Sequence, residues 1–217
     1  MKKTQLKHPK LPRNLPSSEL LKLEDWEEYE SLKLSGCDFT RQSAQNISFE
    51  QVLMRQIMLT GARIPKSHFF DVRMESCDLS GTFLEDSRFH RVEVIACRLM
   101  GIQFISAQIN DVLFKDCNLD GAIFISTKSN FLRFENCSLK NTSFERADLR
   151  KAIFKKCDLS NADFRNAKLE QADFRTSTIN GMALRAEDVK GAIISSIQAT
   201  QMAGLLGLHV LDEDETL

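Results

Sequence analysis

The chain repeats its apolar and polar positions with a period of five residues. From Leu34 to Ile194 every fifth residue is large and apolar, except Ala44 and Ser129, and no residue is inserted or deleted along this run. A second inward position lies two residues before each of these and is small almost throughout. A period of five fits neither an amphipathic helix nor a plain strand. Such a fixed period indicates a repeat architecture.

The pentads predict a coil with flat sides. Two inward residues separated by one outward residue alternate as in a β-strand, so the other two residues must turn the chain. A longer period of 20 residues is carried by Cys77, Cys97, Cys117, Cys137 and Cys157. Each is followed four residues later by glycine or asparagine, which indicates one corner per coil where φ is positive. Four sides therefore make one coil.

The expected fold is all-β: a right-handed quadrilateral parallel β-helix of about eight coils with a short C-terminal α-helix. Stacked coils would place equivalent residues in columns, among them the phenylalanine columns through Phe124 and Phe134. The expected organisation is an N-terminal arm and cap at 1–30, the β-helix at 31–194, and a helix, short strand and acidic tail at 195–217.

Both ends carry their own signals. Residues 17–30 fit either a short helix, with Leu20, Leu23 and Trp26 on one face, or an extended cap. In either form this segment would cover the first open edge of the array. Residues 195–198 have the Ser-x-x-Gln form of a capping box, which predicts a helix to about Leu206 that ends at Gly207. A short strand is expected at 208–211.

Several pentads match a known consensus, Ala-Asp/Asn-Leu-x-x. Good copies are residues 147–151 (ADLRK), 162–166 (ADFRN) and 172–176 (ADFRT). Over about residues 32–194 the chain resembles the pentapeptide-repeat family. That resemblance implies the same right-handed quadrilateral β-helix, and it names a shape more than an activity.

The resemblance also implies a C-terminal, two-fold homodimer, because family members with a similar ending pair through it. The residues expected at this dimer interface are Ile197, Met202, Leu205, Leu206 and Leu208. The alternative is a monomeric cap that folds onto its own last coil.

Composition excludes several classes of function. The chain is 42% hydrophobic, 27% charged and carries a formal net charge of −1, so no overall field attracts nucleic acid or a membrane surface. The N-terminus has no apolar signal-peptide region, and no 18-residue apolar run predicts a membrane span. We therefore expect a cytoplasmic protein with reduced cysteines.

The cysteine column is the most evident candidate for chemistry. Stacked thiols invite a metal site or disulfides, but they would all point the same way into an apolar core instead of converging on one atom. Alanine, serine, threonine and valine fill equivalent positions, so a packing role is the favoured interpretation. The sequence has no phosphate loop, nucleophile motif or zinc signature. We expect a non-enzyme with no catalytic, cofactor-binding or metal residues.

Outward apolar residues give the leading hypothesis for function. Phe83, Ile105, Ile123 and Ile125 fall on one side in neighbouring coils, which is typical of a contact surface. The alternative is that β-branched residues only stabilise the strand sides. The leading hypothesis is a non-catalytic scaffold that binds an unidentified protein through its outer faces. A third hypothesis makes the partner a small ligand or a membrane-associated assembly.

The resemblance supplies a different alternative. Some family members mimic duplex DNA, bind the type II topoisomerases DNA gyrase and topoisomerase IV, and protect them from quinolones. A mimic needs a strongly acidic surface, whereas residues 31–194 carry 23 Lys and Arg against 20 Asp and Glu. One side presents acids that two basic residues interrupt: Asp38, Asp78, Arg98, Asp120, Lys140 and Asp158.

Another side is basic, and its residues are His68, Arg88, Arg91, Lys128, Arg150, Lys151 and Lys168. Binding of single-stranded nucleic acid needs aromatic residues between the basic ones, on which bases stack. This side has only Phe70 and Phe131, so direct nucleic-acid binding is not expected.

Overall fold

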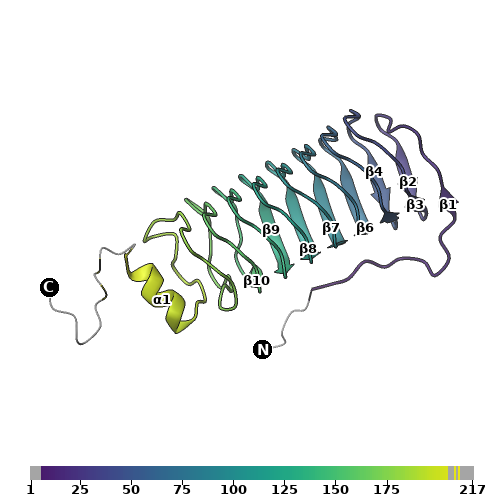
Figure 1. The fold of residues 1–217 in the computed structure, drawn as a ribbon. Coiled ribbons are helices and arrows are strands. Elements are labelled where there is room, and N and C mark those ends of the chain that lie inside the picture. Colours follow the sequence, from purple (N-terminus) through teal and green to yellow (C-terminus); the bar gives the residue numbers. More distant parts are fainter. Residues whose placement is uncertain (1–5, 205–207, 209, 211–217) are drawn as a thin grey trace.

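The computed structural model describes residues 6–204, 208 and 210, which form one long parallel β-solenoid with a helix at its C-terminal end (Figure 1). The strands are β1 (Ser17–Ser18), β2 (Glu28–Glu30), β3 (Lys33–Ser35), β4 (Ser48–Glu50), β5 (Leu53–Arg55), β6 (His68–Glu75), β7 (Arg88–Ile95), β8 (Gln108–Lys115), β9 (Lys128–Glu135) and β10 (Ile153–Lys155), and the helix is α1 (Ser196–Ala203).

Successive coils pair in parallel with an offset of 20 residues. Phe69 of β6 lies beside Phe89 of β7, and the same offset continues from β7 to β8 and from β8 to β9. The other two sides are held by isolated bridges, and one such ladder runs from Asp38 to Thr178 in steps of 20. The predicted four-sided parallel β-helix with a short C-terminal helix is confirmed.

The corners differ from the prediction. Gly81 (φ 63°) and Asn141 (φ 55°) have the positive φ expected of them, but so do Asp86 (φ 54°) and Ser106 (φ 56°) at other corners. The expectation of one such corner per coil is therefore wrong. The reason is hydrogen bonding along the solenoid axis: the N–H of Asp86 donates to Ile105 O (3.0 Å) and that of Ser106 to Ile125 O (2.9 Å). Positive φ lets the ladder continue through each turn.

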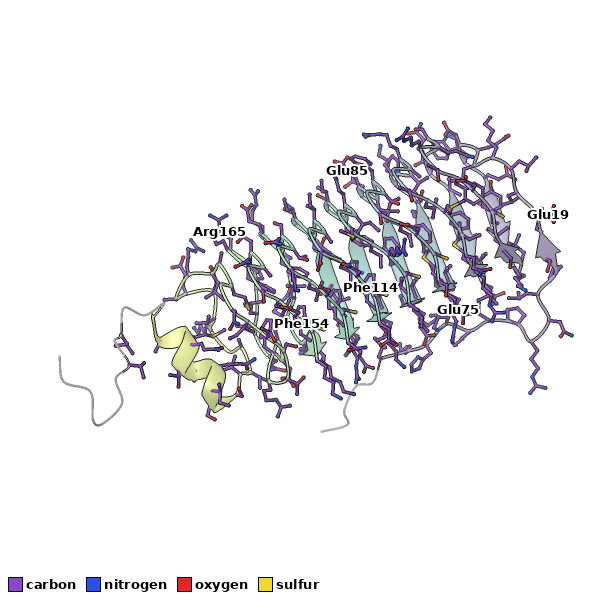
Figure 2. The ribbon with its side chains drawn as sticks, viewed as in Figure 1. Glu19, Glu75, Glu85, Phe114, Phe154 and Arg165 are labelled. Atoms are coloured by element: carbon purple, nitrogen blue, oxygen red, sulfur yellow. The ribbon has the colours of Figure 1, made fainter. Side chains whose placement is uncertain are left out.

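The interior is filled by the predicted columns of rings. Phe104, Phe124 and Phe144 stack with centroids 4.7 and 5.0 Å apart, and Phe134 and Phe154 stack at 5.2 Å in the neighbouring column. Rings of the two columns meet edge to face. Both arrangements suit the aromatic quadrupole. Figure 2 shows Phe154 inside the coil and Arg165 projecting from its edge.

The N-terminal segment is extended, so of the two alternatives for residues 17–30 the helix is wrong. Its backbone joins the solenoid, with Ser17 paired to Lys33 and Glu28 to Ser48. Leu23 is buried, but the side chain of Trp26 is 71% exposed, so these two residues do not share a face. Pairing with the first coils satisfies more backbone groups than an isolated helical turn would.

The C-terminal capping box is present. Ser195 caps α1, its hydroxyl accepts from the Gln198 N–H (3.3 Å), and the Gln198 side chain accepts from the Ser195 N–H (2.9 Å). The helix ends at Ala203 with Gly204 as its C-cap, earlier than the predicted end near Leu206. Of the strand expected at 208–211, residues 209 and 211 lie outside the described residues, and Leu208 and Val210 are not in a strand.

Candidate protein-interaction surfaces

The interior of the solenoid is filled by buried side chains, so any binding site must lie on the outer faces. In the part of the chain that the structure describes, no group of three or more His, Cys, Asp or Glu side chains is placed to hold a metal ion. None of the described helices is long and apolar enough to cross a membrane.

The cysteine column packs as the sequence indicated. All six cysteines are buried and form no disulfide. Each thiol of the column lies near backbone carbonyls, as Cys117 Sγ does at 3.2 Å from Lys115 O and 3.3 Å from Val94 O. The contact with Cys77 and burial both raise the pKa of the Cys97 thiol. The Cys97 thiol, buried and held in its protonated form, is therefore a poor nucleophile and a poor metal ligand.

Phe83, Ile105, Ile123 and Ile125 lie together on one outer face, and we call them the apolar patch. Phe83 and Ile123 belong to one ladder, in which Gln103 lies between them. All four side chains are partly exposed. The Arg63 guanidinium lies 4.2 Å from the centre of the Phe83 ring and covers part of it. The patch therefore groups four apolar side chains on one face, with the polar Gln103 between Phe83 and Ile123 and a cation at one edge.

The acidic side is interrupted by ion pairs. Arg98 Nη1 lies 4.0 Å from Asp78 Oδ2, and Lys140 Nζ lies 3.3 Å from Asp158 Oδ2. On the basic side, Arg91 forms two hydrogen bonds to Asp71 at 2.6 Å each. The acidic side therefore presents no continuous field of negative charge, and on the basic side the charge of Arg91 is offset by Asp71.

The described part of the C-terminal end presents apolar side chains. Ile197 is 75% exposed and Leu208 is 59% exposed, while Met202 is partly buried. Met202 and Leu208 line a hollow of about 310 Å³ with Val189 and Ile194 of the last coil. The other two predicted interface residues, Leu205 and Leu206, lie outside the described residues.

Sequence reasoning missed the path of the arm, which we define as residues 6–16. It runs back along the outside of the solenoid, beneath the strands in Figure 1. The Lys7 N–H donates to Asp111 Oδ1 (3.0 Å), the Lys10 N–H donates to Asp71 Oδ1 (2.9 Å), and His8 Nδ1 lies 2.5 Å from Glu93 Oε1. The sequence did carry one sign of this path. Prolines and basic residues are concentrated in the arm, and acidic residues recur at one corner position of the later coils.

The acids beneath the arm are unusually buried for charged residues. Asp71, Asp111 and Glu93 are 1%, 4% and 7% exposed. Burial raises the pKa of Asp71, but hydrogen bonds from the Arg91 side chain and the Lys10 backbone outweigh it, so this pKa lies below its usual value. Asp71 is thus held ionised by partners on both the solenoid and the arm.

Comparison with known proteins identifies the family. The model of the pentapeptide repeat region matches residues 67–131 and 130–200, which is more than half of the chain. The chain belongs to the pentapeptide repeat family. No curated protein matches it.

Solved structures of other pentapeptide repeat proteins resemble it. Full-length QnrB1, a plasmid-mediated fluoroquinolone resistance protein, is 19% identical with a TM-score of 0.48, and the match covers 88% of this chain and 100% of QnrB1. HetL from the cyanobacterium Nostoc, involved in heterocyst differentiation regulation, is 13% identical with a TM-score of 0.33 over 78% of this chain and 87% of HetL.

Proposed function

We propose that this pentapeptide repeat protein is a non-catalytic scaffold that binds another protein through the apolar patch. The observation that carries the proposal is the partial exposure of Phe83, Ile105, Ile123 and Ile125 on one face. The coil beneath them is already filled by rings such as Phe104 and Phe124, so the patch is not needed to complete the core. Contiguous apolar side chains on an outer face favour a protein contact.

The test compares two pairs of substitutions on the same face. Ile123→Glu with Ile125→Glu puts charges into the patch, whereas Ser143→Glu with Arg146→Glu changes charges one coil further along. Proteins crosslinked to the purified scaffold in cell extract are quantified by mass spectrometry. We expect one partner to be lost with the first pair and kept with the second. Equal capture by both pairs would remove the patch from consideration.

We also propose that two copies pair through their C-terminal ends. The high exposure of Ile197 and Leu208 beside an apolar hollow supports this arrangement. The mass in solution, measured by light scattering after gel filtration, is expected to be that of a dimer. Ile197→Glu should give a monomer and Thr200→Glu, on the same helix, should not. A monomeric unsubstituted protein would overturn the proposal.

The alternative partner is a type II topoisomerase, which the protein would bind by mimicking duplex DNA. The alternation of Asp78 with Arg98 and of Lys140 with Asp158 does not favour it, since a mimic needs a run of negative charge. A gyrase supercoiling assay with a quinolone decides between the two. We expect no protection; protection that Asp78→Asn and Asp158→Asn abolish would make the topoisomerase the partner.

A further inference from the structure

The arm has a three-residue repeat that its contacts with the solenoid follow. Residues 7–15 read Lys-His-Pro, Lys-Leu-Pro and Arg-Asn-Leu, so each triplet begins with a basic residue. The N–H groups of the first two basic residues, Lys7 and Lys10, are the ones that donate to the solenoid. Pro9 and Pro12, which end the first two triplets, have no N–H, so they are not able to compete for the same acceptors.

The acceptors are spaced by the coils. Asp71, Arg91 and Asp111 occupy the same corner in three successive coils, and we call them the corner ladder. Two coil steps span about 9.6 Å. Three residues of polyproline II helix span about 9.3 Å. A segment in this conformation therefore meets every second coil with every third N–H, as Lys7 and Lys10 do.

The corner ladder also selects by charge and by shape. With the arm in place its two aspartates are nearly inaccessible, and each accepts a backbone N–H of the arm instead of a side-chain ammonium. Between them Glu93 Oε1 contacts the His8 ring, and Glu93 Oε2 is held by Arg73 Nη1 at 3.1 Å. The ammonium groups of Lys7 and Lys10 do not make these hydrogen bonds. Their positive charges add long-range attraction to the acids of the edge.

From this register we propose that the corner ladder is a binding edge for a basic, proline-containing segment of another protein in the polyproline II conformation. The arm is the chain's own copy of that ligand and competes with the partner for the edge. The recognised pattern is a basic residue at every third position with proline before the next one. This surface is separate from the apolar patch, so it stands or falls independently of the function proposed above.

The first experiment removes only the donated N–H groups. Full-length protein with Lys7→Pro and Lys10→Pro keeps an extended arm but lacks both donors, and the matched control, Lys7→Ala with Lys10→Ala, loses the side chains and keeps the donors. Trypsin cleavage after Arg13, followed by intact-mass spectrometry, reports release of the arm. We expect cleavage of the proline variant to be at least about tenfold faster than that of the control.

The second experiment offers the ligand in trans. A fluorescent peptide of residues 6–16 is titrated against the full-length proline variant, against unsubstituted protein and against the proline variant carrying Asp71→Asn and Asp111→Asn. We expect binding to the proline variant and at least about tenfold weaker binding where the native arm competes. Binding should also be at least about tenfold weaker with the two asparagines, whose amide oxygens still accept but carry no charge. Asparagine tolerates the positive φ of these corners, and Asp86→Asn, at another such corner, is the control.

Three results would overturn the proposal that the corner ladder binds such a segment. Cleavage after Arg13 that is equally slow in both arm variants would show that the N–H contacts do not hold the arm. A released arm whose peptide does not bind in trans would show that the edge is not a ligand site. Equal binding of a peptide with the same composition in shuffled order would overturn the three-residue register. The Ile123→Glu variant in the proline background should bind the peptide normally, whether or not the apolar patch has a partner.

Discussion

The cost of replacing a core phenylalanine should depend on how many rings it touches. Phe144 and Phe174 are both fully buried, so the area removed from water is the same for each. Phe144 packs against four other rings, two stacked and two edge to face, which are Phe124, Phe164, Phe134 and Phe154. Phe174, nearer the end of its column, meets only Phe154 and Phe164.

Leucine at either position keeps most of the volume and loses the ring contacts. With at least about 0.5 kcal/mol for each aromatic pair, Phe144→Leu should cost about 2 kcal/mol and Phe174→Leu about 1 kcal/mol beyond the shared effect of the swap. Urea denaturation followed by circular dichroism gives both free energies of unfolding, provided that the slope with denaturant is unchanged. Equal losses would refute the idea that ring pairs add to burial in this core.

Three further outcomes are expected. Gln198→Ala should lower stability by about 1–3 kcal/mol in the same denaturation assay, because the buried carbonyls of Phe174 and Ser177 lose the amide that donates to them. A thiol reagent should modify Cys117 in the native protein only as fast as the chain opens, and immediate labelling would contradict its burial. The hydrogen bond from Arg165 holds the pKa of Asp163 below 3.8, so its contribution to stability should be complete above that pH and fall as the pH drops further; Asp163→Asn should flatten this part of the pH profile.

The repeat made the interior predictable and the surface less so. Inward positions recur without a break from Leu34 to Ile194, and steric exclusion from a filled coil allows few arrangements, so the phenylalanine and cysteine columns followed from the spacing. Outward residues obey no such exclusion. Whether Phe83 and Ile123 form a binding surface depends on how far their side chains are exposed. That exposure is known only from the structure.

Two features depended on backbone geometry that side chains alone do not reveal. Asp86 and Ser106 adopt positive φ because their N–H groups must reach the next coil, and residue type gives no sign of that demand. The arm carried a local pattern of prolines and bases, but its partners Asp71 and Asp111 are distant in the chain. Only the stacked coils bring those two acids to one edge.

The path of the arm has a consequence for how the molecule assembles. Neighbouring coils join residues 20 apart, whereas Lys7 and Asp111 are 104 apart. The arm precedes the coils in the chain, but its acceptor Asp111 is in place only after several coils have stacked, so the arm docks late. Such a closure raises the contact order of a fold whose coils otherwise join residues 20 apart, and it should slow the final folding step without slowing the growth of the stack.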